Sequence, residues 1–272
     1  MWASDVPPTL EQVLSGRDSV VIEQRAEGQV TDIRLSALKT VALQVGTQAG
    51  YQRRTFEIEA TLKNQAGRLD QVYNFTGLLL DRNVVPPVLV EARDTVYAEG
   101  GDTLRLADTT YEIITQARFS TTAPNWREYL MRGTAKATVT FKPDPVMQPR
   151  NDAERKFWDA QVKVGWGVGQ QQADMVFAAE LSRLDRDYKG MVLYRHLLYR
   201  NMVSKPYVAE SRLGVTGDGN KIAINDRVLR ITAKPQLETR YERWTAPILP
   251  TGQSDLPITS PAEAAASPEA LP

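Results

Sequence analysis

Residues 200–220 read RNMVSKPYVAESRLGVTGDGN, and residues 81–101 carry a weaker copy of this stretch, DRNVVPPVLVEARDTVYAEGG. A shift of 119 residues aligns the two stretches and brings identical residues together. The identical pairs are Val84 and Val203, Pro87 and Pro206, Glu91 and Glu210, Arg93 and Arg212, Val96 and Val215, and Gly100 and Gly219. Because an internal repeat of this length governs the architecture of a chain, we predict that the protein is built from two related halves.

Apolar residues recur at helical spacing in two long segments. In the first they are Leu38, Val41, Ala42, Val45 and Ala49, and in the second Trp158, Val162, Trp166, Ala173 and Phe177. Steps of three and four residues are typical of an amphipathic helix, so we predict long helices at about 32–66 and 152–188. Asn151 and Glu154 have the spacing of a capping box, which marks the start of the second helix.

Each long helix is followed by the same sequence of shorter elements. We predict short helices at 69–83 and 191–203, each ending at a proline that cannot continue it. An extended stretch and a glycine turn come next, and then a hairpin around Ala107-Asp108 in the first half and around Asn225-Asp226 in the second. The predicted fold class is therefore α+β. Each half contains a long amphipathic helix, a short helix, a proline turn and a small β-hairpin, and the halves pack as one pseudo-twofold unit.

Composition divides the chain into an ordered domain and two terminal segments. The last 28 residues, 245–272, hold six of the 16 prolines and no aromatic residue, so they bury too little apolar area to offset their ordering entropy. We predict a lead segment at 1–29, an α+β domain at 30–244 and a disordered tail at 245–272. Within the domain the repeats are about 30–119 and 151–238, joined by a connector at 120–150.

Both long helices contain a Gly-x-x-x-Gly pattern. The 119-residue shift matches Gly46 with Gly165 and Gly50 with Gly169. A glycine inside a helix costs about 1 kcal/mol relative to alanine, and glycines four residues apart let another backbone approach closely. We therefore predict that the two helices cross at these glycines. The alternative is that they are scattered weak points of the helices.

Composition excludes several kinds of chemistry. Lys+Arg and Asp+Glu both total 33, so no overall basic excess favours nucleic acid, and we expect no direct nucleic-acid binding. Without cysteine, and with His196 as the one histidine, thiolate chemistry and multi-histidine metal sites are excluded. The cluster Gly214–Gly219 predicts a turn, because a phosphate-binding loop needs Lys-Ser/Thr after its last glycine. We predict no catalytic residue, no cofactor and no metal, and hence no enzyme.

Four aromatic residues are candidates for a partner interface, where large amphipathic side chains are favoured. They are Trp126, Tyr129, Trp158 and Tyr207. A role in the core is the alternative for these side chains. The repeated pairs Glu91 with Arg93 and Glu210 with Arg212 are interpreted as ion pairs that anchor the chain after each proline turn.

Four long motifs carry a family resemblance: NFTGLLLDRNVVPPVLVEARDTV, APNWREYL, GMVLYRHLLYRNMVSKPYV and LGVTGDGNKIAINDRVLRITAKP. They resemble the DotC proteins of Dot/Icm type IVB secretion systems and the TraI lipoproteins of IncI-type conjugative plasmids. The resemblance covers about residues 35–240. It implies an α+β structural subunit without enzymatic activity, lying on the periplasmic side of the outer membrane in the core complex of a secretion or conjugation system.

The resemblance also implies partners. Members of this family form a ring with DotD-like and DotH-like proteins and with further copies of themselves. The family's signal peptide and lipidated cysteine do not occur in the printed sequence, which also has no run of about 18 apolar residues that would span a membrane. A different function is a periplasmic peptide- or small-ligand-binding, or chaperone-like, module that uses a cleft between the two halves.

Overall fold

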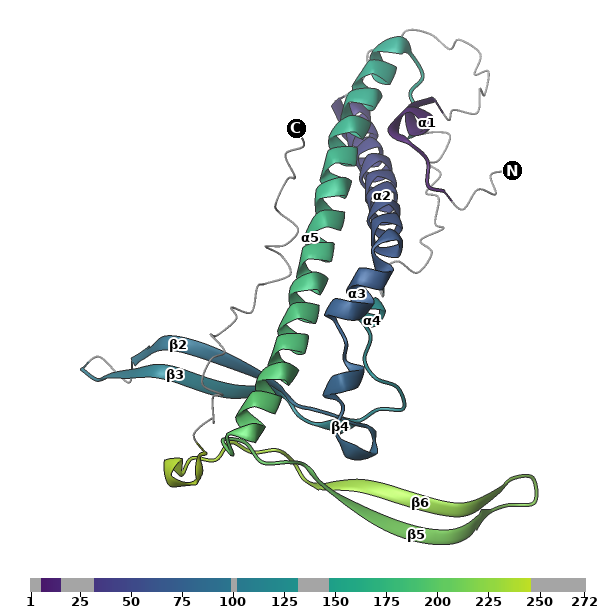
Figure 1. The fold of residues 1–272 in the computed structure, drawn as a ribbon. Helices are drawn as coiled ribbons and strands as arrows, with labels where there is room; N and C mark the ends of the chain where they lie inside the picture. Colours follow the sequence, from purple (N-terminus) through teal and green to yellow (C-terminus); the bar gives the residue numbers. More distant parts are fainter. Residues whose placement is uncertain (1–5, 16–31, 99–101, 132–146, 246–272) are drawn as a thin grey trace, which may run out of the picture. The chain divides into compact units, whose positions relative to one another are not determined.

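A computed structural model describes residues 6–15, 32–98, 102–131 and 147–245 (Figure 1). The elements, in chain order, are α1 (Leu10–Ser15), α2 (Asp32–Asn64), α3 (Ala66–Val72), η1 (Thr76–Leu78), η2 (Asp81–Asn83), β1 (Val84–Val85), β2 (Val88–Ala98), β3 (Leu104–Thr115), β4 (Arg118–Phe119), α4 (Trp126–Leu130), α5 (Asp152–Tyr199), β5 (Tyr207–Gly217), β6 (Ile222–Ala233) and η4 (Tyr241–Arg243). This mixture of helices and antiparallel strands confirms the α+β class.

The chain divides into two compact units, and each unit takes parts from both repeats. Unit 1 comprises Met1–Leu69 and Trp126–Leu184, and unit 2 comprises Asp70–Asn125 and Asp185–Pro272. Helix α2 and most of α5 belong to unit 1, whereas the strands β1–β6 of the described residues belong to unit 2. The compact units thus combine corresponding parts of the two repeats. The pseudo-twofold relation between whole halves stays a prediction, and the predicted tail lies outside the described residues from 246 onward.

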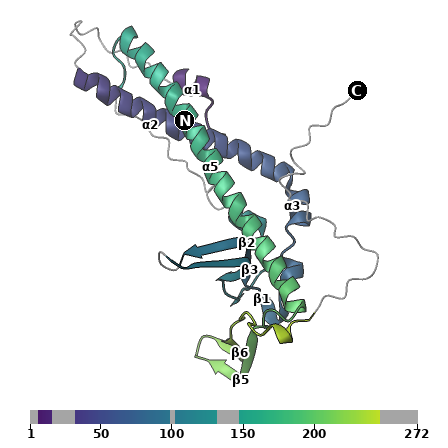
Figure 2. The ribbon, with the colours of Figure 1, turned by 90° about the vertical axis from the view of Figure 1, so that its left-hand side faces the viewer.

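Helices α2 and α5 cross in unit 1 at the paired glycines (Figure 2). A Cβ atom on Gly46 would lie 2.9 Å from the amide nitrogen of Trp166, and one on Gly165 would lie 3.0 Å from the amide nitrogen of Thr47. Gly50 and Gly169 face the other backbone at equally short range. Any side chain at these positions would collide with main-chain atoms. The prediction that the long helices cross at these four glycines is therefore confirmed.

Large apolar side chains pack where the two helices meet. The buried cluster consists of Leu38, Ala42, Trp158 and Val162, and Leu10, Val13, Leu14, Val41 and Val45 pack against it. These residues come from α1, α2 and α5, so the short N-terminal helix belongs to the same core. The predicted helix 32–66 is confirmed as α2, which ends at Asn64.

Helix α5 begins at the predicted cap. The Asn151 side chain accepts a hydrogen bond of 2.8 Å from the Glu154 amide, while the Glu154 carboxylate accepts one of 2.8 Å from the Arg150 amide. Glu154 is only 3% exposed, and Arg34 of α2 donates to both of its oxygens, at 2.7 Å and 3.0 Å. The buried carboxylate therefore joins the helix cap to α2.

In unit 2, α5 continues to Tyr199, so the prediction of a break and a separate helix at 191–203 is wrong. Gly190 lies inside the helix because the base of β2 packs there: a Cβ atom at Gly190 would come within 3.0 Å of the Leu89 nitrogen. Leu89, Tyr194, Leu197 and Val203 form the buried core of this unit. Burial raises the pKa of Tyr194 to about 12, and its hydroxyl donates to the Ser204 carbonyl at 3.2 Å.

The prediction of one helix over 69–83 is wrong beyond Val72. There the chain folds into two 3-10 turns, and Arg82 and Asn83 adopt left-handed φ angles of 62° and 57°. The rings of Tyr73 and Phe75 pack edge-on against Tyr188 at 5.4 Å and 5.2 Å between centroids. These aromatic contacts fix the chain in a conformation that a regular helix would not allow.

The hairpins are longer than predicted and turn at different places. β2 pairs with β3 and β5 pairs with β6 over their lengths. Ala107-Asp108 and Asn225-Asp226 lie inside β3 and β6, so the prediction of hairpin turns there is wrong. The extended stretches after the prolines are themselves the first strands. In the second hairpin the turn is at 218–221, where the Asp218 side chain accepts from the Asn220 amide at 2.8 Å and the Lys221 amide at 3.0 Å.

The glycine crossing can be tested by alanine substitution. Gly165→Ala should lower the free energy of unfolding by about 1–3 kcal/mol, because the added methyl group collides with the backbone of α2. Gly167→Ala is the matched control, since a Cβ there would meet nothing within 4 Å apart from its own helix backbone and its chain neighbours; it should raise stability by about 0.5–1 kcal/mol through helix propensity. Denaturant unfolding followed by tryptophan fluorescence measures both. Equal effects of the two variants would contradict the crossing.

The buried ion pair should make unit 1 sensitive to acid. The hydrogen bond from Arg34 holds the pKa of Glu154 below its ordinary value of 4.5. A lowered folded-state pKa stabilises the protein above the unfolded-state value, and this stabilisation is lost as pH falls through the folded-state value. Glu154→Gln should therefore cost about 2 kcal/mol at pH 7 and little in strong acid. The exposed Asp152→Asn in the same helical turn should cost only about 0.5 kcal/mol. A pH-independent difference between Glu154→Gln and wild type would contradict this role.

Candidate protein-interaction surface

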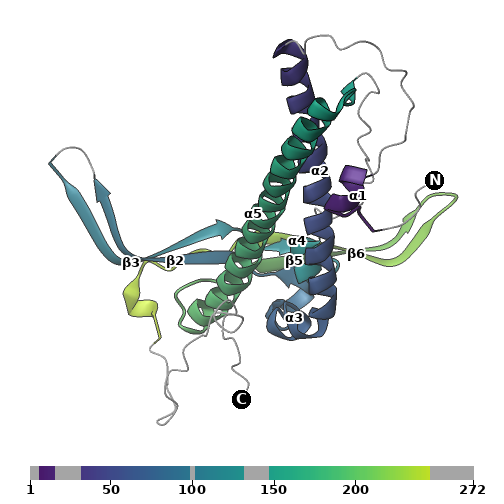
Figure 3. The same cartoon turned by 90° about the horizontal axis from the view of Figure 1, so that it is seen from above.

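Two long two-stranded hairpins of unit 2, β2–β3 and β5–β6, form the candidate surface (Figure 3). In the described part of the chain neither hairpin has a third strand, so one edge of each strand pairs with no other strand. An isolated two-stranded hairpin is marginally stable in water, and exposed edges readily pair with another chain. The free strand edges of the two hairpins can therefore form main-chain hydrogen bonds with a partner.

The outer part of β2–β3 carries an exposed apolar face. Val96 pairs with Leu106 and Ala98 pairs with Leu104. Alternation along the strands puts these side chains on one face of the ribbon. Val96, Leu104 and Leu106 are 56%, 61% and 69% exposed. We call these three residues the first tip cluster.

The outer part of β5–β6 carries an equivalent face. Val215 pairs with Ile224, and Ile222 lies two residues from Ile224 on the same face. Val215, Ile222 and Ile224 are 68%, 68% and 74% exposed. We call these residues the second tip cluster. Both ribbons thus present one valine and two larger aliphatic side chains near the turn.

The buried core of unit 2 holds the first hairpin at its base. Val88 and Leu89 at the start of β2 are buried, and the rest of the strand becomes progressively exposed. Tyr111 and Ile113 of β3 pack against the buried cluster around Tyr194. The core of unit 2 therefore holds the base and leaves the tip cluster free to contact another molecule.

The predicted interface aromatics are mostly core residues. Trp126, Tyr129 and Trp158 are buried within unit 1, with Arg127 stacked 4.3 Å from the Trp126 ring and Arg183 lying 5.5 Å from the Tyr129 ring. The prediction of a partner interface is wrong for these three, because the chain itself covers them. Tyr207 is 67% exposed at the start of β5, so its interface role stays a prediction.

The repeated residues serve the architecture of the hairpins. Pro87 is fully buried before β2, and Pro206 is half-buried before β5. Arg93 pairs with Glu91 at 2.8 Å, and Arg212 pairs with Glu210 at 3.6 Å, as the interpretation of these residues as ion pairs requires. Gly219 lies in the β5–β6 turn. Gly100 lies outside the described residues.

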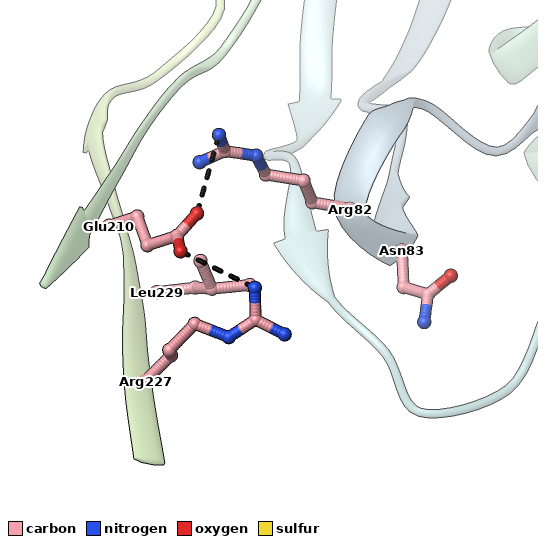
Figure 4. A pocket seen from close by; sticks show the side chains of 5 residues that line it. All are labelled: Arg82, Asn83, Glu210, Arg227 and Leu229. Carbon is pink, nitrogen blue, oxygen red and sulfur yellow. Dashed lines mark ion pairs between the residues drawn. The ribbon is translucent and has the colours of Figure 1, made fainter. Parts of the chain in front are cut away.

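A hollow of about 380 Å³ lies beside the second hairpin (Figure 4). Its lining consists of Arg82, Asn83, Glu210, Arg227 and Leu229. The carboxylate of Glu210 lies 3.5 Å from Arg82 and 3.5 Å from Arg227. These ion pairs join residues that line the hollow. Arg82 also donates a hydrogen bond to the Val208 carbonyl at 3.2 Å, which connects β5 to the turn η2.

The described residues contain no group of three or more His, Cys, Asp or Glu side chains arranged to hold a metal. His196 is exposed on α5. None of the helices in these segments is both long enough and apolar enough to cross a membrane.

Sequence reasoning missed the tip clusters. Leu104-x-Leu106 and Ile222-x-Ile224 have the alternation of a strand, and such alternation ordinarily indicates a face turned toward a core. Their position beyond Gly100 and Gly219 in each repeat was the available indication that they lie near a turn. Whether another layer covers these side chains depends on which strands pair, and the local sequence does not show that.

One family model matches the chain. Its description is type IV secretory system, conjugal DNA-protein transfer, and it covers residues 32–246. The match includes both long helices and both hairpins. A comparison with curated proteins gives no significant match.

The ion-pair network should stabilise the second hairpin more than its counterpart stabilises the first. Glu210→Gln leaves Arg82, Arg212 and Arg227 close together without a compensating charge, so protection of β5–β6 from hydrogen exchange should fall by about fivefold, or roughly 1 kcal/mol. The matched Glu91→Gln removes one exposed pair with Arg93 and should change β2–β3 by less. Equal changes in the two hairpins would contradict the network.

Proposed function

The chain belongs to the type IV secretory system, conjugal DNA-protein transfer family, and we propose that it is a structural subunit of the outer-membrane core complex of a type IVB system. In this role it stands in a ring on the periplasmic side of the outer membrane, beside DotD-like and DotH-like proteins. It supports the transfer of DNA or protein through assembly and without catalysis. Its family membership makes it an envelope-associated component of a secretion machine.

The observation that carries this proposal is the pair of hairpins with uncovered edges and apolar tip clusters. Contiguous exposed aliphatic side chains mark interaction sites in soluble domains. Strand edges add main-chain hydrogen bonds to a partner, and side-chain pockets add specificity. Two such ribbons give one chain two separate docking elements, which is what a subunit with neighbours on two sides needs.

The ligand-binding alternative receives less support. A small-molecule site is concave and largely apolar, with a few convergent polar groups. The hollow beside β5–β6 is lined by two arginines, an asparagine and a glutamate with Leu229 as the apolar member, and its charges already pair with one another. This lining favours a structural role for the hollow.

Co-expression with DotD-like and DotH-like proteins from the same system tests the proposal. The expected result is a co-purifying complex of far higher mass than the free chain. Replacing Leu106 and Ile224 with asparagine should weaken co-purification, because each change removes one large side chain from a tip cluster. Ile33→Asn with Val164→Asn is the matched control, since both side chains are exposed but lie on helices. Recovery of the free chain alone from wild-type co-expression would refute the proposal.

A further inference from the structure

We propose that the acidic segment 246–272 docks, within the same molecule, on three arginines beside the hollow of the second hairpin. The arginines surround the Glu210 carboxylate in unit 2 and are Arg82, Arg212 and Arg227. The occupant is the segment that follows Thr245, and the basis is charge complementarity together with chain length. The inference does not depend on the proposed function, because it concerns the free chain.

The site carries a positive excess. One carboxylate, that of Glu210, is shared by three guanidinium groups, at 3.5 Å from Arg82, 3.6 Å from Arg212 and 3.5 Å from Arg227. Three positive charges against one negative charge leave an excess of two. Arg212 and Arg227 are also direct cross-strand neighbours in the register, and like charges in such positions destabilise a hairpin. A further anion at this site therefore stabilises the second hairpin.

The guanidinium groups have donors to offer to an anion. A charge-assisted hydrogen bond between a guanidinium and a carboxylate spans about 2.7–2.9 Å, and all three distances to Glu210 are longer. Arg212 and Arg227 are 82% and 60% exposed. Figure 4 shows Glu210 between Arg82 and Arg227, and the hollow of about 380 Å³ has room for a further carboxylate.

The first hairpin has a different charge at the corresponding place. There the equivalent pair is Glu91 with Arg93, one charge of each sign at 2.8 Å. The 119-residue shift matches Arg227 with Asp108, so an acidic residue stands where the second hairpin has an arginine. The two hairpins share their strand pairing and differ in charge, which makes the first hairpin an internal control for the second.

The segment 246–272 has the charge that the site lacks. It holds Asp255, Glu263 and Glu269 and no lysine, arginine or histidine, so its side chains carry a net charge of −3. Leu256 closely follows the first of these acids, and the hollow offers Leu229 as an apolar contact. The segment therefore complements the site in charge and in apolar character.

The length of the chain allows this contact within one molecule. The Thr245 amide donates to the Arg200 carbonyl at 2.8 Å, so the segment starts beside the end of α5. Glu210 is ten residues from Arg200, which is at most about 36 Å for a fully extended chain. Asp255 is also ten residues from Thr245. Glu263 is eighteen residues from Thr245, so its reach of about 60 Å exceeds the distance to the site.

Tethering favours this occupant over a separate anion. Exposed ion pairs contribute only about 0–1 kcal/mol each, which gives a free acidic peptide a weak affinity for the site. A tethered segment meets the site at an effective concentration in the millimolar range, so weak contacts suffice to hold it. The docked segment then competes with any acidic partner surface that approaches the second hairpin.

A spin label in the segment tests the contact in the full chain. The sequence has no cysteine, so Ser254→Cys provides a single labelling site beside Asp255. In NMR spectra at low salt the amide signals of β5–β6 near Arg212 should broaden, and those of β2–β3 near Arg93 should not. Salt at about 1 M, where the screening length is about 3 Å, should remove most of this broadening. Equal broadening of the two hairpins would overturn the proposal.

Charge substitutions test the role of the arginines. Arg212→Gln with Arg227→Gln should reduce the docked population at least about fivefold, since two exposed ion pairs are lost. Glu210→Gln should increase it, because the competing carboxylate is removed. The control is Arg93→Gln with Arg105→Gln, which takes two arginines from the first hairpin and should leave the broadening unchanged. An unaltered population in the first variant, or an equal loss in the control, would contradict docking on the arginines.

A mixing experiment identifies which molecule supplies the segment. Spin-labelled chains without isotopes, mixed with isotope-labelled chains without the spin label, should leave the β5–β6 signals sharp. Broadening in the mixture as strong as within one chain would assign the contact to a neighbouring copy and overturn docking within one molecule.

Competition with a free peptide tests whether the segment occupies the site. The probe is a synthetic peptide with the sequence of residues 246–272, and fluorescence anisotropy measures its binding. The full chain with Asp255→Asn, Glu263→Gln and Glu269→Gln should bind the peptide at least about threefold more tightly than wild type, because its own segment no longer competes. Equal affinities of the two chains would show that the segment does not cover the arginines.

Discussion

Direct contact between the backbones of α2 and α5 is the constraint on which unit 1 depends. No side chain separates the two backbones at the four glycines, so the peptide groups of the two helices come into van der Waals range there. Each glycine lowers helix stability by about 1 kcal/mol, and the close approach allows Leu38, Trp158 and Val162 to pack tightly beside it. The stabilisation from packing at the crossing therefore exceeds the loss of helix propensity that the glycines cause.

The same duplication shapes the backbone contacts of both units. Gly46 faces the Val162 carbonyl and Gly165 faces the Leu43 carbonyl, and the 119-residue shift converts one contact into the other. In unit 2 each repeat makes a comparable main-chain hydrogen bond of its own: Ser120 donates to Asn83 at 3.1 Å, and Glu238 donates to Met202 at 2.9 Å. The reciprocal contacts at the glycines explain why unit 1 combines pieces of both repeats. Because the long helix of each repeat packs on the long helix of the other, neither repeat has a complete core by itself.

The features that follow local rules could be predicted from sequence, and those that depend on tertiary packing could not. Apolar periodicity located α2 and α5, and the matched glycines located their crossing. The helix break near Gly190 was predicted wrongly because the cost of a buried glycine is offset by the approach of β2, which no local pattern reveals. For Trp126 both a core role and an interface role were open, because the sequence of an irregular connector does not show which residues cover its side chains. The tip clusters looked like ordinary strand residues.

The two hairpins expose aliphatic side chains and strand edges that the rest of the described chain does not cover. The buried core of unit 2 holds the base of the first hairpin, so the exposed aliphatic side chains at the tips can change without loss of core packing. Apolar ribbon tips alone would invite pairing of any two copies, including aggregation through like edges. A partner that covers the tip clusters removes this hazard, because it buries the aliphatic side chains and pairs the free strand edges.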